Sequence, residues 1–169
     1  MSNVRAITPC LWFNSEAERA AHFYVSIFPA SRVTHTSRFT DVGKEHHRQP
    51  ANSVMTVSFE LDGQPFVALN GGPMFKFNEA ISFQVMCDTQ EEVDHFWERL
   101  GEGGDPHAQQ CGWLKDQFGV SWQVIPRRLL ELLNSPDAAL ARRASEAMFR
   151  MKKFDIAELE RAAAAHAPA

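Results

Sequence analysis

The amino-acid sequence predicts an α+β domain made of two copies of one βαβββ module, followed by a helical extension. The main observation is a repeated phrase, because ERAAHFY at residues 18–24 returns as EEVDHFW at residues 91–97. A strand-like apolar run precedes each phrase, and runs rich in β-branched and aromatic residues follow it. We therefore expect two similar modules that bury each other's open sheets within one domain.

Both repeated phrases carry the start signal of a helix. Ser15 and Asp88 stand three residues before Glu18 and Glu91, which is the spacing of a capping box. Apolar residues then recur at three- and four-residue steps, the period of one helical face. The strands expected before the two helices are Ile7–Phe13 and Ala80–Cys87.

Further strand-like runs follow each predicted helix. In the first module they are Ser31–Phe39, Val54–Leu61 and Phe66–Asn70, with a loop at 43–52 and a hairpin turn at Asp62-Gly63. In the second module they are His107–Gln110, Gly112–Lys115 and Ser121–Ile125. Module one therefore spans residues 5–70, and module two spans residues 80–126. The glycines and proline of residues 71–79 indicate a linker.

Residues 127–169 are predicted to form a helical extension. A short helix is expected at Arg127–Leu133, and Ser135 with Pro136 begins a second that runs to about Lys153. Asp155 and Glu158 have the spacing of a cap for a third. The apolar residues of this extension need cover, so we expect it to pack on the domain or on a dimer partner.

Composition narrows the class of protein. The formal net charge of −4 argues against a nucleic-acid-binding protein. The sequence has no apolar run of membrane-spanning length and no pattern typical of a signal peptide, so we expect a cytoplasmic protein without a membrane partner. The three cysteines have no zinc-type spacing and are expected to be reduced thiols.

Several short motifs in combination resemble one known family. They are LWFN (11–14), FY (23–24) with FP (28–29), FELDGQ (59–64), LNGGP (69–73), CGWLKD (111–116) and WQVIP (122–126). The sequence resembles the PhnB-like branch of the vicinal oxygen chelate superfamily, which includes glyoxalases, bleomycin-resistance proteins and extradiol dioxygenases. The resemblance covers nearly the whole chain. It implies paired βαβββ modules, a concave sheet around a pocket, and usually a homodimer.

The resemblance also places the metal ligands of metal-dependent relatives. They fall at about Pro9, Asn70, Ser82 and Gln123, none of which is a His, Glu or Asp. Neutral oxygen ligands alone bind a transition metal weakly. We therefore expect no metal and no cofactor, although a divalent metal or S-adenosylmethionine stays open as an alternative. Asn70 and Gln123 are interpreted as hydrogen-bonding groups for an organic ligand.

Strand alternation predicts which side chains reach the pocket. Ile81, Phe83 and Val85 are expected under the helices, which leaves Gln84 on the same open face as Gln123. The candidate ligand-binding residues are Trp12, Asn70, Phe75, Phe77, Gln84, Cys111, Trp113, Lys115 and Gln123. Cys111 is also the candidate catalytic nucleophile, for which the sequence assigns no basic partner.

Three functions are compatible with these features. The first is a small-molecule-binding protein or enzyme of this fold, of unassigned substrate and without the usual metal centre. The second is a methyltransferase of the demethylubiquinone type, the label that members of the branch often carry. It would need a nucleotide-like cofactor site, and the first predicted strand leads into its helix without a glycine-rich loop. The third is a metal-dependent lyase or dioxygenase of the glyoxalase type. The sequence does not decide whether the protein is an enzyme.

Overall fold

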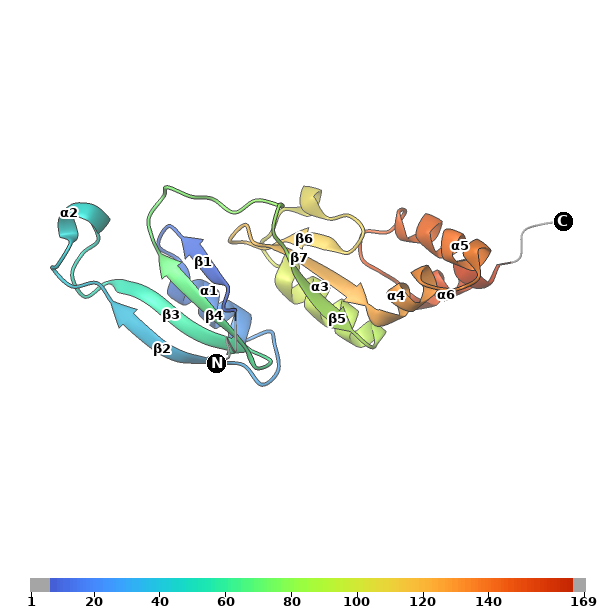
Figure 1. The fold of residues 1–169 in the computed structure, drawn as a ribbon, viewed down its shortest axis with the longest axis horizontal. Coiled ribbons are helices and arrows are strands. Elements are labelled where there is room, and N and C mark those ends of the chain that lie inside the picture. The colour runs from blue at the N-terminus through green and yellow to red at the C-terminus, as the bar shows by residue number, and fades with distance from the viewer. Residues whose placement is uncertain (1–6, 166–169) are drawn as a thin grey trace, which may run out of the picture. The chain divides into compact units, whose positions relative to one another are not determined.

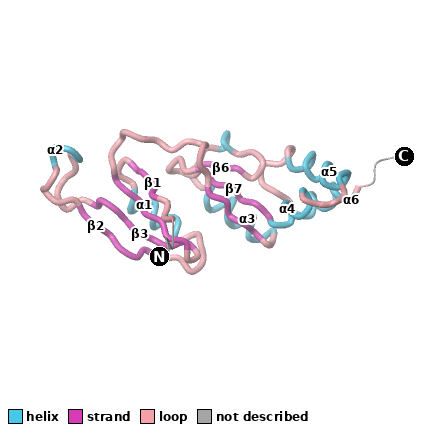
Figure 2. The backbone as a smooth tube through the Cα atoms, in the orientation of Figure 1, coloured by secondary structure: helices cyan, strands magenta, loops and turns pink. Residues whose placement is uncertain are grey.

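The computed structural model describes residues 7–165 and divides the chain into two compact units. The first unit ends at Phe77 and the second begins at Asn78, inside the predicted linker (Figure 1). Each unit has its own strands and helices, as the tube in Figure 2 shows. Residues 5 and 6 of the predicted first module and residues 166–169 of the predicted extension lie outside the described residues.

The first unit has the predicted βαβββ order. Its elements are β1 (Cys10–Phe13), α1 (Ala17–Val25), β2 (Arg32–Arg38), α2 (Lys44–His47), β3 (Val54–Leu61) and β4 (Gln64–Asn70). The sheet order is β1-β4-β3-β2, in which β1 runs parallel to β4 and the other pairs are antiparallel. The short helical turn α2 lies in the connection that the sequence predicts as a loop.

The core of the first unit lies between α1 and one face of the sheet. Alternation along β3 buries Val57, Phe59 and Leu61 on this face, where Tyr24 of α1 stacks on Phe59 with ring centroids 6.1 Å apart. Full burial of such side chains stabilises the fold by about 1.5–3 kcal/mol each. The opposite face of the sheet carries half-buried side chains and faces away from the helix.

The second unit contains a smaller sheet. Its first elements are β5 (Phe83–Cys87), α3 (Gln90–Gly101), a 3-10 helix (Pro106–Ala108), β6 (Trp113–Lys115) and β7 (Ser121–Pro126). The sheet order is β5-β7-β6, with β5 parallel and β6 antiparallel to β7. Together the two units confirm the predicted α+β fold, although the described part of the second module has one strand fewer than predicted.

The predicted strand His107–Gln110 is therefore wrong. Pro106 lacks the backbone N–H that a sheet ladder uses, and the Asp105 side chain accepts the N–H of His107, which starts the 3-10 helix. Only Gln110 pairs with another strand, through an isolated bridge to Trp113.

Two other predicted strands are too long at their N-terminal ends. β1 begins at Cys10, and Ile7 before it is 86% exposed. β5 begins at Phe83, so Ile81 precedes the ladder and is 73% exposed instead of packing under a helix. Alternation holds only where the backbone is paired in the sheet.

The predicted caps of the two repeated helices are also shifted. α3 begins after Thr89, whose side chain accepts the N–H of Glu92 while the Glu92 carboxylate accepts the N–H of Thr89, so the capping box is one residue later than predicted. α1 begins after Glu16 instead of Ser15. The cap of α1 comes from a residue distant in sequence, as described below.

The extension forms three helices, α4 (Arg127–Leu133), α5 (Ala138–Met148) and α6 (Ile156–Ala164). The first matches its predicted bounds, and Asp155 caps α6 as predicted. α5 ends five residues earlier than expected, and Asp137 rather than Ser135 caps it by accepting two N–H groups.

The extension packs on the second unit. Its buried side chains form one cluster with Ile125 of β7, and Met86 and Cys111 pack against this cluster. Phe154 is 1% exposed within it, whereas Phe149, also expected to need cover, is 65% exposed. No helix within residues 7–165 is long and apolar enough to cross a membrane.

Candidate functional site

The aromatic residues predicted for the pocket in the first unit lie together. Trp12 of β1 donates its indole N–H to the Gly72 carbonyl oxygen at 2.8 Å, and its ring meets Phe75 edge-on with centroids 4.9 Å apart. Phe13 meets Phe77 in the same way at 5.2 Å. Residues 71–77 are therefore held along β1.

Gly71 is necessary for this arrangement. A Cβ atom at residue 71 would lie 2.2 Å from the Trp12 ring, closer than any real contact. The glycine that the sequence suggests as a linker breaker thus serves a close approach between backbone and indole.

Asn70 has a structural role. Its amide oxygen accepts the N–H of Ala17 at 2.8 Å, and its amide nitrogen donates to the Val54 carbonyl oxygen at 3.0 Å. The side chain is 7% exposed and joins the end of β4 to the first turn of α1. Asn70 therefore supplies the cap expected from Ser15, and its amide is held by the fold on both sides.

The open face of the second sheet brings together three of the predicted ligand-binding residues. Gln84, Gln123 and Trp113 are direct neighbours across β5, β7 and β6, so they form one row. Gln84 donates its amide N–H to the Gln123 amide oxygen at 3.3 Å, and Gln123 donates to the Ser82 hydroxyl oxygen at 2.7 Å. The two glutamines therefore lie on the same face of the sheet, as strand alternation predicts.

Lys115 lies one row further along the same face. It is paired in the sheet with Ser121, and its ammonium group forms an ion pair with Glu79. The Lys115 side chain is 24% exposed and that of Glu79 is 61% exposed. Lys115, which donates a hydrogen bond to this carboxylate, holds the pKa of Glu79 below its usual value, so Glu79 is ionised at neutral pH.

Cys111 lies apart from this row. With Gly112 it forms a two-residue hairpin loop in which both residues have positive φ, at 50° and 79°. Its thiol donates to the Met148 carbonyl oxygen at 3.5 Å, and its backbone N–H donates to the Met151 carbonyl oxygen at 2.9 Å. Cys111 therefore anchors the helical extension, and these contacts do not provide it with a base.

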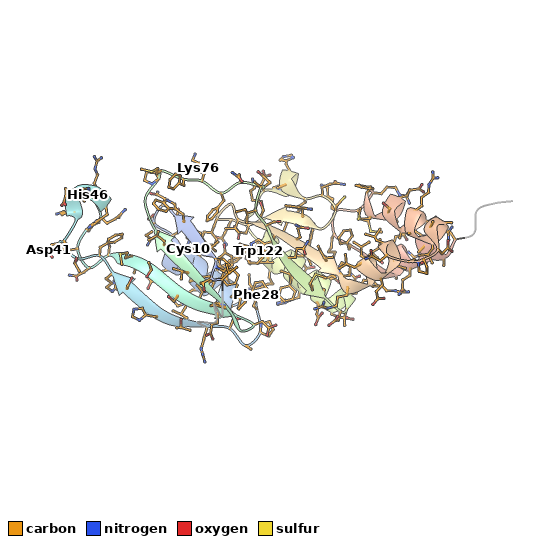
Figure 3. The ribbon with its side chains drawn as sticks, in the orientation of Figure 1. Cys10, Phe28, Asp41, His46, Lys76 and Trp122 are labelled. Atoms are coloured by element: carbon orange, nitrogen blue, oxygen red, sulfur yellow. The ribbon has the colours of Figure 1, made fainter. Side chains whose placement is uncertain are left out.

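A separate, open surface depression of about 430 Å³ lies between the end of α3 and the segment before β6. It is lined by Trp97, Glu98, Arg99, Gly101, Glu102 and Gln109. None of the predicted site residues lines it, so it is not the predicted pocket. Figure 3 shows Asp41 and His46 in the connection that carries α2, away from Cys10 on β1.

Two further polar residues on or beside this face, Ser121 and Glu79, are not among the residues predicted from the sequence. Ser121 stands two residues before Gln123, so strand alternation places it on the same face. Glu79 had no such signal, because it precedes the strand and meets Lys115 only through the tertiary fold.

Comparison with known proteins identifies the family of this chain. A family model described as 3-demethylubiquinone-9 3-methyltransferase matches residues 5–125. The chain belongs to this family. It is a PhnB-like member of the vicinal oxygen chelate superfamily, as the sequence motifs predicted.

Solved structures agree with the family. A PhnB protein from Bacillus cereus, described as a putative 3-demethylubiquinone-9 3-methyltransferase, is 32% identical over 72% of this chain and 99% of its own, with a TM-score of 0.61. A Pseudomonas aeruginosa protein at 21% identity has a TM-score of 0.55 over 71% of this chain and 96% of its own, and this likeness shows the fold alone. The fosfomycin resistance protein FosX of Mesorhizobium loti, at 14% identity, has a TM-score of 0.50 over 74% and 92%, and shows the fold alone. No curated protein sequence matches the chain.

The metal of the superfamily does not fit the residues of this PhnB-like chain. In the first unit, Pro9 has no donor atom in its side chain, and the Asn70 amide is bonded to the backbone. In the second, Ser82 and Gln123 are hydrogen-bonded to each other and offer only neutral oxygen atoms. Within residues 7–165 no three His, Cys, Asp or Glu side chains gather as a metal site would require.

Proposed function

We propose that this PhnB-like protein binds a small organic molecule on the open face of its second sheet and acts without the metal centre of its superfamily. The observation that carries the proposal is the row of Gln84, Gln123 and Trp113, in which Gln84 donates to Gln123 and Gln123 donates to Ser82. Amide and hydroxyl groups that are positioned by one another, next to an aromatic wall, are typical of small-molecule sites.

The row has both hydrogen-bond donors and acceptors available to a ligand. Each glutamine amide has two N–H donors and one oxygen acceptor, and only part of this capacity is used within the row. Gln84 is exposed, while Gln123 and Trp113 are half-buried. A ligand can therefore reach the row and exchange its own hydrogen bonds for those between the side chains.

Native mass spectrometry of freshly purified protein tests the proposal. The difference from the denatured mass reports a retained organic molecule, a metal ion and the number of subunits together. We expect the wild-type protein to retain an organic molecule without a metal. Gln123→Leu should lose it, whereas Gln64→Leu, which changes an exposed glutamine of the first unit, should keep it. One metal ion per chain, or retention by Gln123→Leu, would contradict the proposal.

Methyl transfer is the second candidate, because the family description names it. Neither the β1–α1 connection nor the segment after Gly71-Gly72 has the glycine-rich turn into a helix that is typical of a nucleotide-like cofactor site. β1 leads into α1 through Asn14, Ser15 and Glu16 without a glycine, and Gly71-Gly72 leads into an irregular segment instead of a helix. Isothermal titration with S-adenosylmethionine decides the matter, and micromolar affinity would place methyl transfer first.

We also propose that the protein is a homodimer in solution. The extension covers most of its own apolar surface, so it is not the main candidate interface. Each unit has larger apolar side chains that are uncovered: Met74 and Phe75 of the first unit are 76% and 58% exposed, and Ile81 of the second unit is 73% exposed. Light scattering should give twice the chain mass of 19.1 kDa, and the monomer mass at micromolar concentration would refute the dimer.

A further inference from the structure

Ser121 has an unexplained buried hydroxyl group. The residue is 2% exposed, and among the described residues its Oγ atom has no hydrogen-bond partner. A buried polar group without a partner destabilises a protein by about 1–3 kcal/mol, so most such groups in native proteins have one. A hydrogen bond from the Ser121 hydroxyl to an additional molecule would remove this cost.

The neighbours of Ser121 on the open face are hydrogen-bond donors. Lys115 is paired with it across β6 and β7 and carries an ammonium group. On the other side, the Ser82 hydroxyl oxygen accepts from Gln123, which leaves its own hydrogen for another acceptor. Ser82 directly precedes Phe83, and Ser121 directly precedes Trp122, the residue that pairs with Phe83 in the sheet.

The hydroxyl groups of Ser82 and Ser121 and the ammonium group of Lys115 are all hydrogen-bond donors, so together they suit an anion. Charge-assisted hydrogen bonds to carboxylate or phosphonate oxygens are shorter and stronger than neutral ones. Trp113 stands two residues before Lys115 on the same face, so an aromatic surface adjoins the donors. A ligand with a negative group and a flat apolar body matches both features.

In this structure the ammonium group of Lys115 forms an ion pair with the Glu79 carboxylate. Its carboxylate accepts a hydrogen bond from Lys115, and its side chain is the more exposed partner. Glu79 precedes β5 in an irregular segment, whereas Lys115 is in a strand. Glu79 is therefore the partner that can leave without disturbing the sheet.

We propose that Ser82, Ser121 and Lys115 bind the anionic group of a small organic ligand, and that the Glu79 carboxylate takes the place of this group until the ligand displaces it. The inference rests on the proposed function and names the class of ligand for the same face. The ligand class is an aromatic or alicyclic carboxylate or phosphonate.

The test is an NMR titration of the full chain, followed through backbone amide shifts of the second sheet. The probes are benzoate, phenylphosphonate and the neutral analogue benzamide. The variants are Glu79→Gln, Lys115→Met and Ser121→Ala, with Glu102→Gln as a matched control because Glu102 is an exposed glutamate of the same unit.

We expect both anions to shift the amides of β6 and β7. Glu79→Gln should tighten anion binding about threefold to fivefold, the scale of an exposed ion pair. Lys115→Met should weaken it about 10- to 100-fold, the scale of a hydrogen bond to a charged group. Ser121→Ala should weaken it without lowering the unfolding midpoint, because it removes an unpaired buried hydroxyl. Glu102→Gln should change nothing.

Two results would overturn the inference. If benzamide binds as well as benzoate and neither Glu79→Gln nor Lys115→Met changes the ratio, the anion site is wrong, while ligand binding on this face stands. If no probe binds to any variant, the inference also fails, and the retained mass in the native spectrum then judges the proposed function separately. Tighter binding of benzoate or of phenylphosphonate shows which of the two anionic groups Ser82, Ser121 and Lys115 bind better.

Discussion

Replacing Asn70 separates a structural role from a ligand-binding role. Asn70→Ala removes the acceptor of the Ala17 N–H and the donor to the Val54 carbonyl oxygen. Loss of a helix cap costs about 0.5–2 kcal/mol, and a buried group left unpaired costs about 1–3 kcal/mol. The two effects overlap at the Ala17 N–H, so we expect the first unit to be destabilised by about 2–4 kcal/mol.

Urea denaturation with hydrogen exchange at individual amides measures this effect. Two compact units need not unfold together, so exchange within α1 reports the first unit by itself. With a slope of about 2 kcal/mol per molar urea, the midpoint of the first unit should fall by about 1–2 M. Asn14→Ala is the matched control, since Asn14 is exposed at the same junction of strand and helix.

One result would refute the reasoning. If Asn70→Ala unfolds within about 0.5 kcal/mol of the wild type, the cap does not stabilise α1, because surface changes away from structural features have effects of this size. If the same variant also loses the retained organic molecule, Asn70 is the ligand group that the sequence predicts.

The remaining predictions concern the hairpin loop and the thiols. Gly112→Ala should destabilise the second unit by more than about 2 kcal/mol, since φ is 79° and a Cβ would lie 2.4 Å from the Phe154 ring. Gly63→Ala, at φ 80° with nothing within 4 Å, should destabilise the first unit only by the backbone strain of about 1–2 kcal/mol, and an equal loss of stability in the second unit of Gly112→Ala, each measured against the wild type, would contradict the packing argument. Burial raises the pKa of the Cys87 thiol to about 12, so a thiol reagent at pH 8 should modify exposed Cys10 first and Cys87 only on unfolding. The pKa of Cys87 is about 12 in the folded protein and 9.0 in the unfolded chain. The contribution of this thiol to stability is therefore complete below pH 9 and is lost as the pH rises toward 12. Rapid modification of both thiols in the folded protein would show that Cys87 is accessible.

The sequence alone was enough for features whose cause is local. Alternation and an Asp-Gly turn predicted β3 and its hairpin correctly, because both depend on neighbouring residues. The same period placed Gln84 and Gln123 on one face. The repeated phrase predicted the two modules, since equal patterns of apolar residues favour equal strand and helix orders.

Only the tertiary structure decided which distant groups meet. Asn70 caps a helix that begins 53 residues earlier, Cys111 supports an extension 37 residues later, and Glu79 meets Lys115 across 36 residues. The tertiary structure also buries the Ser121 Oγ atom, which has no hydrogen-bond partner within residues 7–165. Hydrogen bonds of this kind depend on strand register and packing, which bring together residues that have no common pattern in the sequence.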